Sequence, residues 1–138
     1  MERAGSGRNG PEEDTVKISS NLSLMRKEWC NAFYTLNIEQ LDYLEADWFF
    51  STNGIKFMYK KNQLHKLSVL RGQDASAFSQ HKRTESNVEV RELGNLAAVS
   101  GVAFIVTPQG SKQINFVESW IKINDSWKLQ FQSFEGEG

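Results

Sequence analysis

One acidic residue interrupts an otherwise apolar segment near the end of the chain. Glu118 lies in 116-FVESWIKI-123, between Phe116 and Trp120. If this segment is a strand that lines an apolar cavity, loss of hydration would raise the pKa of the Glu118 carboxyl and make it an effective general base. The simpler alternatives are that Glu118 pairs with a nearby arginine or lysine, or that it faces solvent.

Two further side chains could take part in the same chemistry. Asp47 precedes the aromatic run 48-WFFSTNG-54, where its carboxylate could point into the cavity or simply end the preceding helix. Tyr59 could donate a hydrogen bond to a ligand oxygen, or lie at a sheet edge. We therefore predict three catalytic candidates, with Glu118 as the base, Tyr59 as a donor and Asp47 as a second carboxylate.

The two histidines are weaker candidates. His65 lies off the apolar stripe of its predicted helix, so we expect it in solvent. His81 precedes Lys82 and Arg83 in a run that is typical of a solvated surface patch. Either imidazole could still enter a cavity if the strand that carries His81 is bulged.

A ligand cavity needs apolar walls and a few well-placed polar groups, and the sequence offers both. Its aromatic residues are more often core than ligand platform, but in a hollow fold the same side chains can serve as both. The predicted ligand-binding residues are Trp29, Phe33, Trp48, Phe50, Trp120, Gln130 and Gln132.

The turn between Trp120 and Trp127 decides which side chains share a face of the last hairpin, because side chains alternate along a strand. We expect a three-residue loop with Asp125 in the left-handed conformation, which pairs Lys122 with Ser126. A two-residue turn would reverse the grouping. The expected loop places one set of side chains on an apolar outer face, suited to a homodimer interface: Val117, Ile121, Trp127, Leu129 and Phe131.

Hydrophobic spacing predicts helices first and strands afterwards. Apolar residues recur every three or four positions over 15–35, again after a cap at Asn37, and over 60–73. Strand patterns cover 48–59 with a turn at Asn53-Gly54, and then 77–93, 96–107, 113–122 and 127–134. Gly101 would either leave room for a ligand or let its strand bend. This order predicts an α+β fold with helices on one face of a curved antiparallel sheet.

Composition limits the kinds of partner. The 138 residues suit one domain, which we place at 14–135 after a flexible tail at 1–13. A net charge of -1 gives no basic stripe for nucleic acid or an anionic membrane, and no apolar run is long enough to span a membrane. Cys30 is the only cysteine, which excludes an internal disulfide and favours the cytoplasm. With two histidines and no Cys/His cluster, we expect no metal site.

Four segments together resemble a known family. They are 29-WCNAFYTLNIEQLDYL-44, 47-DWFFSTNG-54, 94-GNLAAVSGVAF-104 and 119-SWIKINDSWKL-129, and they are similar to segments of the nuclear transport factor 2-like superfamily, in particular its SnoaL-like and ketosteroid-isomerase-like branch. The resemblance implies a cone-shaped cystatin-like roll with a pocket at its open end and dimers packed through sheet faces. Asp125 departs from the glycine that is usual in relatives.

The resemblance implies two kinds of function. The first is a small-molecule-binding protein whose ligand is apolar with one or two oxygens. If it is an enzyme, it would be an isomerase, cyclase or dehydratase that acts by proton transfer without a cofactor. The alternative is a non-catalytic dimerisation or protein-association module, which would have a filled cone.

Overall fold

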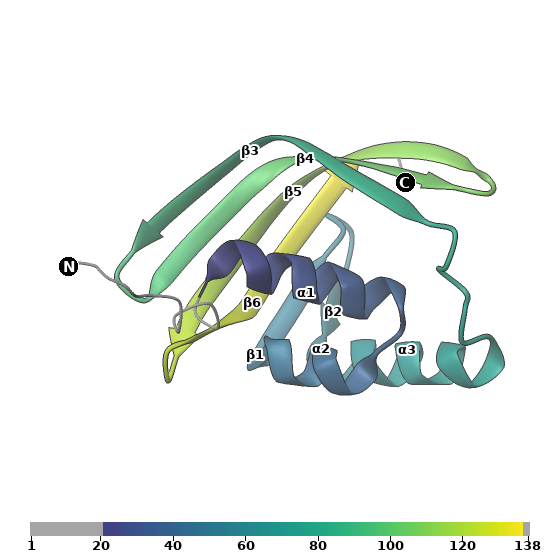
Figure 1. Cartoon of the computed structure of the whole chain (residues 1–138), viewed down its shortest axis with the longest axis horizontal. Coiled ribbons are helices and arrows are strands. Elements are labelled where there is room, and N and C mark those ends of the chain that lie inside the picture. The colour runs from purple at the N-terminus through teal and green to yellow at the C-terminus, as the bar shows by residue number, and fades with distance from the viewer. Residues whose placement is uncertain (1–20, 137–138) are drawn as a thin grey trace, which may run out of the picture.

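The computed structural model describes residues 21–136. The predicted tail at 1–13 and the first residues of the predicted helix at 15–35 lie outside this range. Three helices cover the concave face of a six-stranded sheet that curls without closing (Figure 1). The elements are α1 (Leu22–Tyr34), α2 (Ile38–Leu44), β1 (Glu45–Thr52), β2 (Phe57–Tyr59), α3 (Lys60–Gln73), β3 (Lys82–Leu93), β4 (Leu96–Thr107), β5 (Gly110–Ile123) and β6 (Ser126–Gly136).

Asparagine side chains start the first two helices. The Asn21 side chain accepts a hydrogen bond from the Leu24 amide at 3.1 Å, and the Asn37 side chain accepts one from the Gln40 amide at 3.2 Å. Each satisfies an amide that has no partner within the first helical turn. The cap predicted at Asn37 is therefore confirmed, and so is the third helix over 60–73.

The sheet order is β2-β1-β6-β5-β4-β3. All neighbouring strands are antiparallel except β1 and β6, which run parallel. The strand predicted over 77–93 begins only at Lys82. The chain before it is held in turns, partly because Asp74 accepts hydrogen bonds from the Ser76 amide and hydroxyl at 3.1 Å.

The strand β3 bends over the helices, and Gly101 makes the bend possible. The register with β4 shifts between Ser86 and Glu89, and Asn87 adopts a φ of 54° there. A Cβ at Gly101 would lie 2.9 Å from Phe116 Cζ and 3.2 Å from Val88 Cα. The missing side chain therefore makes room for the Phe116 ring and the bent strand, rather than for a ligand.

The last hairpin has a two-residue turn, so the predicted three-residue loop is wrong. Asn124 and Asp125 both have positive φ, at 51° and 65°, and Lys122 pairs with Trp127. Two successive left-handed residues match the right-handed twist of a hairpin, and Asn and Asp tolerate that conformation well. The register shift lies farther along the strands, between Ser119 and Trp120.

This turn moves two residues of the predicted outer face to the inside. Trp127 and Leu129 are 1% and 0% exposed and belong to the core. The register shift then restores the predicted grouping farther along, since Glu118 pairs with Gln132 and both are buried. Of the five residues predicted for the outer face, Val117, Ile121 and Phe131 are not part of this core.

The core lies between the helices and the concave face of the sheet. Its largest side chains with almost no exposure are Trp120, Trp127 and Phe49. Within residues 21–136, no helix is both long enough and apolar enough to cross a membrane.

Candidate functional site

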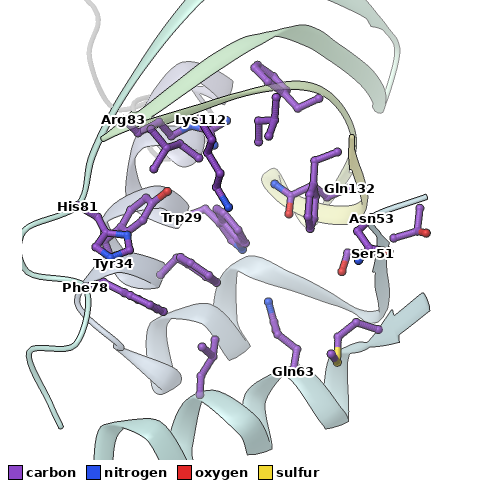
Figure 2. Close-up of a pocket in the computed structure, with 18 of the residues that line it drawn as sticks. Trp29, Tyr34, Ser51, Asn53, Gln63, Phe78, His81, Arg83, Lys112 and Gln132 are labelled. Carbon is purple, nitrogen blue, oxygen red and sulfur yellow. The ribbon is translucent and has the colours of Figure 1, made fainter. Parts of the chain in front are cut away.

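A cavity of about 440 Å³ opens beside this core, between α1, α3 and the inner face of the sheet. Its volume lies within the usual range for small-molecule sites. Figure 2 shows side chains from the helices and from the strands pointing into the same space. The lining residues are Trp29, Phe33, Tyr34, Ser51, Thr52, Asn53, Lys56, Met58, Gln63, Lys66, Leu67, Phe78, His81, Arg83, Ile105, Thr107, Lys112, Ile114, Phe116, Gln132 and Phe134.

Aromatic rings form one wall of the cavity. Trp29 and Phe33 lie one helical turn apart on α1 and stack with their centroids 5.4 Å apart. Phe78, in the turns before β3, continues the stack at 5.5 Å from Phe33 with an interplanar angle of 9°. The His81 ring lies 5.0 Å from Phe78 and 6.0 Å from Tyr34. This wall offers a flat ligand large apolar surfaces at low cost in conformational entropy.

Neutral polar groups line another part of the cavity (Figure 2). Ser51 faces inward from β1 because side chains alternate along the strand, and Phe50 beside it faces outward. Asn53 follows β1, Gln63 comes from α3 and Gln132 from β6. Hydroxyl and amide groups of this kind can bind ligand oxygens or N–H groups.

A buried carboxyl group lies directly behind this lining. Glu45 is 2% exposed, and its Oε2 accepts hydrogen bonds from Trp29 Nε1 at 2.9 Å and from Gln63 Nε2 at 3.0 Å. Burial raises the pKa of Glu45 to about 7, although these two hydrogen bonds oppose the shift. Glu45 Oε1 and Gln63 Oε1 are buried, and neither accepts a hydrogen bond from any described residue.

Glu118 is buried as predicted, but it is part of an ion-pair network. Its two oxygens accept hydrogen bonds from Arg26 at 2.7 and 3.0 Å, and Trp120 Nε1 donates to Oε1 at 2.9 Å. Arg26 also binds both oxygens of Glu85, which in turn accepts hydrogen bonds from Arg83. Burial alone would lower the pKa of Arg26, but the two carboxylates outweigh it and raise that pKa. Glu118 therefore pairs with an arginine, which is one of the simpler alternatives to a catalytic role.

The cavity brings together only part of the predicted site. Trp29, Phe33 and Gln132 line it, whereas Glu118 and Trp120 are buried outside its lining. The remaining predicted residues face elsewhere. Trp48 and Tyr59 are more than half exposed, and the Asp47 side chain is fully exposed. The Phe50 ring packs on Phe131. The Gln130 side chain accepts a hydrogen bond from Trp48.

Three important groups, Glu45, Tyr34 and Arg83, were not predicted from the sequence, and a fourth, His81, was only an alternative that depended on a bulged strand. Glu45 lies two residues before Asp47. Because the strand register is irregular between Glu45 and Phe50, Glu45 faces the interior and Asp47 faces solvent. Tyr34 carries no pattern beyond helix spacing, and burial raises its pKa. His81 and Arg83 line the cavity instead of forming a solvated patch, because the bend in β3 folds their segment inward. His65 is exposed on α3 and outside the lining.

Within the described part of the chain, no three His, Cys, Asp or Glu side chains gather where they could hold a metal ion.

Comparison with family models gave no match, and comparison with curated proteins gave none either.

Solved structures do match, over nearly the whole described chain. An NTF2-like protein from Cytophaga hutchinsonii superposes with a TM-score of 0.69 at 14% identity, covering 84% of this chain and 95% of the other. A cystatin-like protein of unknown function from Nostoc punctiforme gives 0.69 at 12% identity, covering 89% and 93%. This chain has the NTF2-like fold.

A third NTF2-like structure carries a suggested activity. It is a proposed dehydratase from Streptomyces avermitilis, with a TM-score of 0.69, 14% identity, and coverage of 87% of this chain and 96% of that one. Identities at this level establish the fold alone, because NTF2-like and other widespread folds host many unrelated functions.

Proposed function

We propose that this chain is a small-molecule-binding protein whose ligand occupies the cavity between α1, α3 and the sheet. The observation that carries the proposal is the cavity itself, with about 440 Å³ of space beside a stacked aromatic wall and four neutral polar side chains. An association module with a filled cone would have no such space. The combination favours a ligand with a flat apolar body and a few oxygens or N–H groups.

Titration calorimetry with 2-naphthamide, a neutral planar probe, tests this proposal. We expect one site per chain and a loss of binding in Met58→Trp, because Met58 lines the cavity and a larger side chain there would fill it. Val69→Trp is the matched control, since Val69 is 47% exposed on α3 and outside the lining. Binding that survives Met58→Trp, or that never occurs, would refute the proposal.

Proton-transfer catalysis is a second candidate, and the structure changes which residues would perform it. Neither Glu45 nor Glu118 lines the cavity, whereas His81 and Tyr34 both do, on the same wall. An imidazole is a common general base, and burial raises the pKa of the Tyr34 hydroxyl so that it remains a donor. The proposed dehydratase among the structural neighbours is compatible with such chemistry.

Exchange of the acidic C–H protons of 2-tetralone into heavy water, followed by NMR, would detect this activity. We expect the protein to accelerate exchange and His81→Asn to abolish the acceleration. His65→Asn should have no effect, since His65 is exposed outside the cavity. Equal exchange rates with and without the protein would eliminate the catalytic role while leaving ligand binding intact.

A homodimer through the outer face of the sheet forms the third part of the proposal. Phe57, Tyr59 and Trp48 are 59%, 57% and 52% exposed on or beside β1 and β2, and Val117 is 44% exposed on β5. Exposed apolar groups of this size often mark an interface. In sedimentation equilibrium we expect a dimer that Phe57→Arg dissociates and Val69→Arg does not. A monomeric mass for the unmodified chain would contradict the dimer.

A further inference from the structure

The charged residues that line the cavity are all of one sign. They are Lys56, Lys66, Arg83 and Lys112, and none of the described residues in the lining is Asp or Glu. The whole chain is balanced, with 16 Lys and Arg against 17 Asp and Glu, so this excess is local. A cleft with cations and low-dielectric walls concentrates anions.

The three lysines are available to a ligand. Lys56, Lys66 and Lys112 are exposed, and across residues 21–136 no carboxylate forms a salt bridge with any of them. They come from three separate parts of the fold, the β1–β2 turn, α3 and β5. Figure 2 shows Lys112 reaching toward the cavity from the strand side, near Arg83.

Arg83 is fixed in place by the partly buried ion-pair network. Its Nε donates to Glu85 Oε2 at 3.0 Å, and its side chain is only 13% exposed. Glu85 is itself held by two hydrogen bonds from Arg26, which is bound to Glu118. Its Nη2 also lies 2.9 Å from Glu85 Oε2, so Glu85 engages two of the three guanidinium nitrogens. Arg83 nevertheless lines the cavity, where a carboxylate or phosphate could accept from its remaining N–H groups.

One wall of the same cavity is a parallel stack of Trp29, Phe33 and Phe78. We infer that the ligand of this cavity is a planar ring compound that carries an anionic group, with its ring against the aromatic stack and its anion among Arg83 and the lysines. The inference rests on the proposed function, because it assigns a chemical class to the ligand of that cavity.

Calorimetric titrations with 2-naphthoic acid and 2-naphthamide, which share one ring system and differ in charge, test the inference. We expect the acid to bind about tenfold more tightly than the amide at low salt. Raising the salt to about 0.3 M should reduce this preference, because exposed charges are screened, while amide binding stays constant.

The triple variant Lys56→Gln/Lys66→Gln/Lys112→Gln should lower affinity for the acid about tenfold and leave the amide unchanged. Lys27→Gln/Lys61→Gln/Lys82→Gln is the matched control. These three lysines are exposed and lie outside the lining, and replacing them removes the same amount of positive charge. A similar loss of acid binding in the control would overturn the inference by showing that only net charge matters.

The two proposals fail in different ways. If acid and amide bind equally well, the anionic assignment is wrong and the ligand-binding function stands. If neither compound binds, the ligand-binding function and the anionic assignment are both refuted.

Discussion

Glu45 and Glu118 are two carboxyl groups with almost the same burial, at 2% and 4% exposure, but with partners of different kinds. Glu118 binds the guanidinium of Arg26 through both oxygens. The Glu45 carboxyl accepts hydrogen bonds only from neutral donors among the described residues, Trp29 and Gln63, and its Oε1 accepts none from them. The nearest cation, Lys60, donates to the Glu45 backbone carbonyl instead. Burying a charge requires either an opposite charge or its neutralisation by a proton, and these two residues illustrate the two solutions.

The difference also separates two roles in the fold. The Glu118 network joins α1 to β5 and β3, and it ends at Arg83 in the cavity lining. Glu45 instead orients two lining side chains through neutral hydrogen bonds, with a pKa of about 7. The first arrangement fixes one cationic side chain, Arg83, in the cavity lining, and the second adds a group that titrates near neutral pH.

Removing the central cation should have the largest effect. Arg26→Met leaves the buried Glu118 without its cation and the partly buried Glu85 with Arg83 alone. We expect a loss of about 3–5 kcal/mol in the free energy of unfolding, measured by urea denaturation at pH 7. Arg91→Met is the control, because the Arg91–Glu89 pair is 72% and 62% exposed and should contribute less than about 1 kcal/mol. Equal losses in the two variants would show that burial does not make the Arg26 ion pairs contribute more to stability than an exposed pair.

Neutralising Glu118 should destabilise the protein by a smaller amount. Glu118→Gln keeps the shape of the side chain but removes charge-assisted hydrogen bonds to Arg26, so we expect a loss of about 2–3 kcal/mol at pH 8. Arg26 would still be paired with Glu85, which limits the damage. An unchanged midpoint of denaturation would mean that the charge on Glu118 is not needed.

The same substitution at Glu45 should stabilise the protein at high pH instead of destabilising it. Its pKa is raised from 4.5 to about 7 in the folded protein, so the fold binds an extra proton between these values and loses stability as the pH rises through this window. Glu45→Gln removes that loss. We expect it to match the unmodified protein near pH 4.5 and to exceed its stability by about 2 kcal/mol at pH 8. Parallel pH profiles for the two proteins would contradict the assignment.

The smallest predicted effect concerns one neutral donor. Trp29→Phe removes the indole N–H that favours the ionised form of Glu45, so the pKa of Glu45 should rise by about one further unit. A titration of the Glu45 side-chain carboxyl carbon by NMR would measure the shift. Gln40→Ala, which touches Glu28 rather than Glu45, should leave that pKa unchanged. A falling pKa in Trp29→Phe would show that the indole acts mainly through burial.

Most of the architecture could be predicted from short-range patterns. Asn37 marked the start of α2, and Leu96–Thr107 is a strand over the predicted residues, because caps and alternation depend on neighbours in the chain. The burial of Glu118 beside Trp120 was also predicted correctly. Two of the five residues predicted for the outer face were placed incorrectly, because one residue in the length of a turn moved Trp127 and Leu129 to the other side of the sheet.

The candidate site was harder to predict than the fold, since its groups come from distant segments. Trp29, Phe33 and Gln132 were expected there, and His81 only if its strand were bulged. Tyr34, Arg83 and Glu45 were not expected. The patterns around His81 and Arg83 are typical of a solvated strand end. Only the bend of β3 over α1 brings them to the cavity (Figure 1).

The sequence by itself determined the order of helices and strands, the near balance of charge and the amphipathic faces, because each depends on residue types at short spacing. Tertiary structure alone decided which carboxyl group is paired with a cation and which is left to bind a proton. Arg26 and Glu118 are 92 residues apart, and Glu45 replaces Asp47 in the interior through a shift in strand register. The ionisation of a buried acid depends on neighbours in space, and the fold chooses those neighbours.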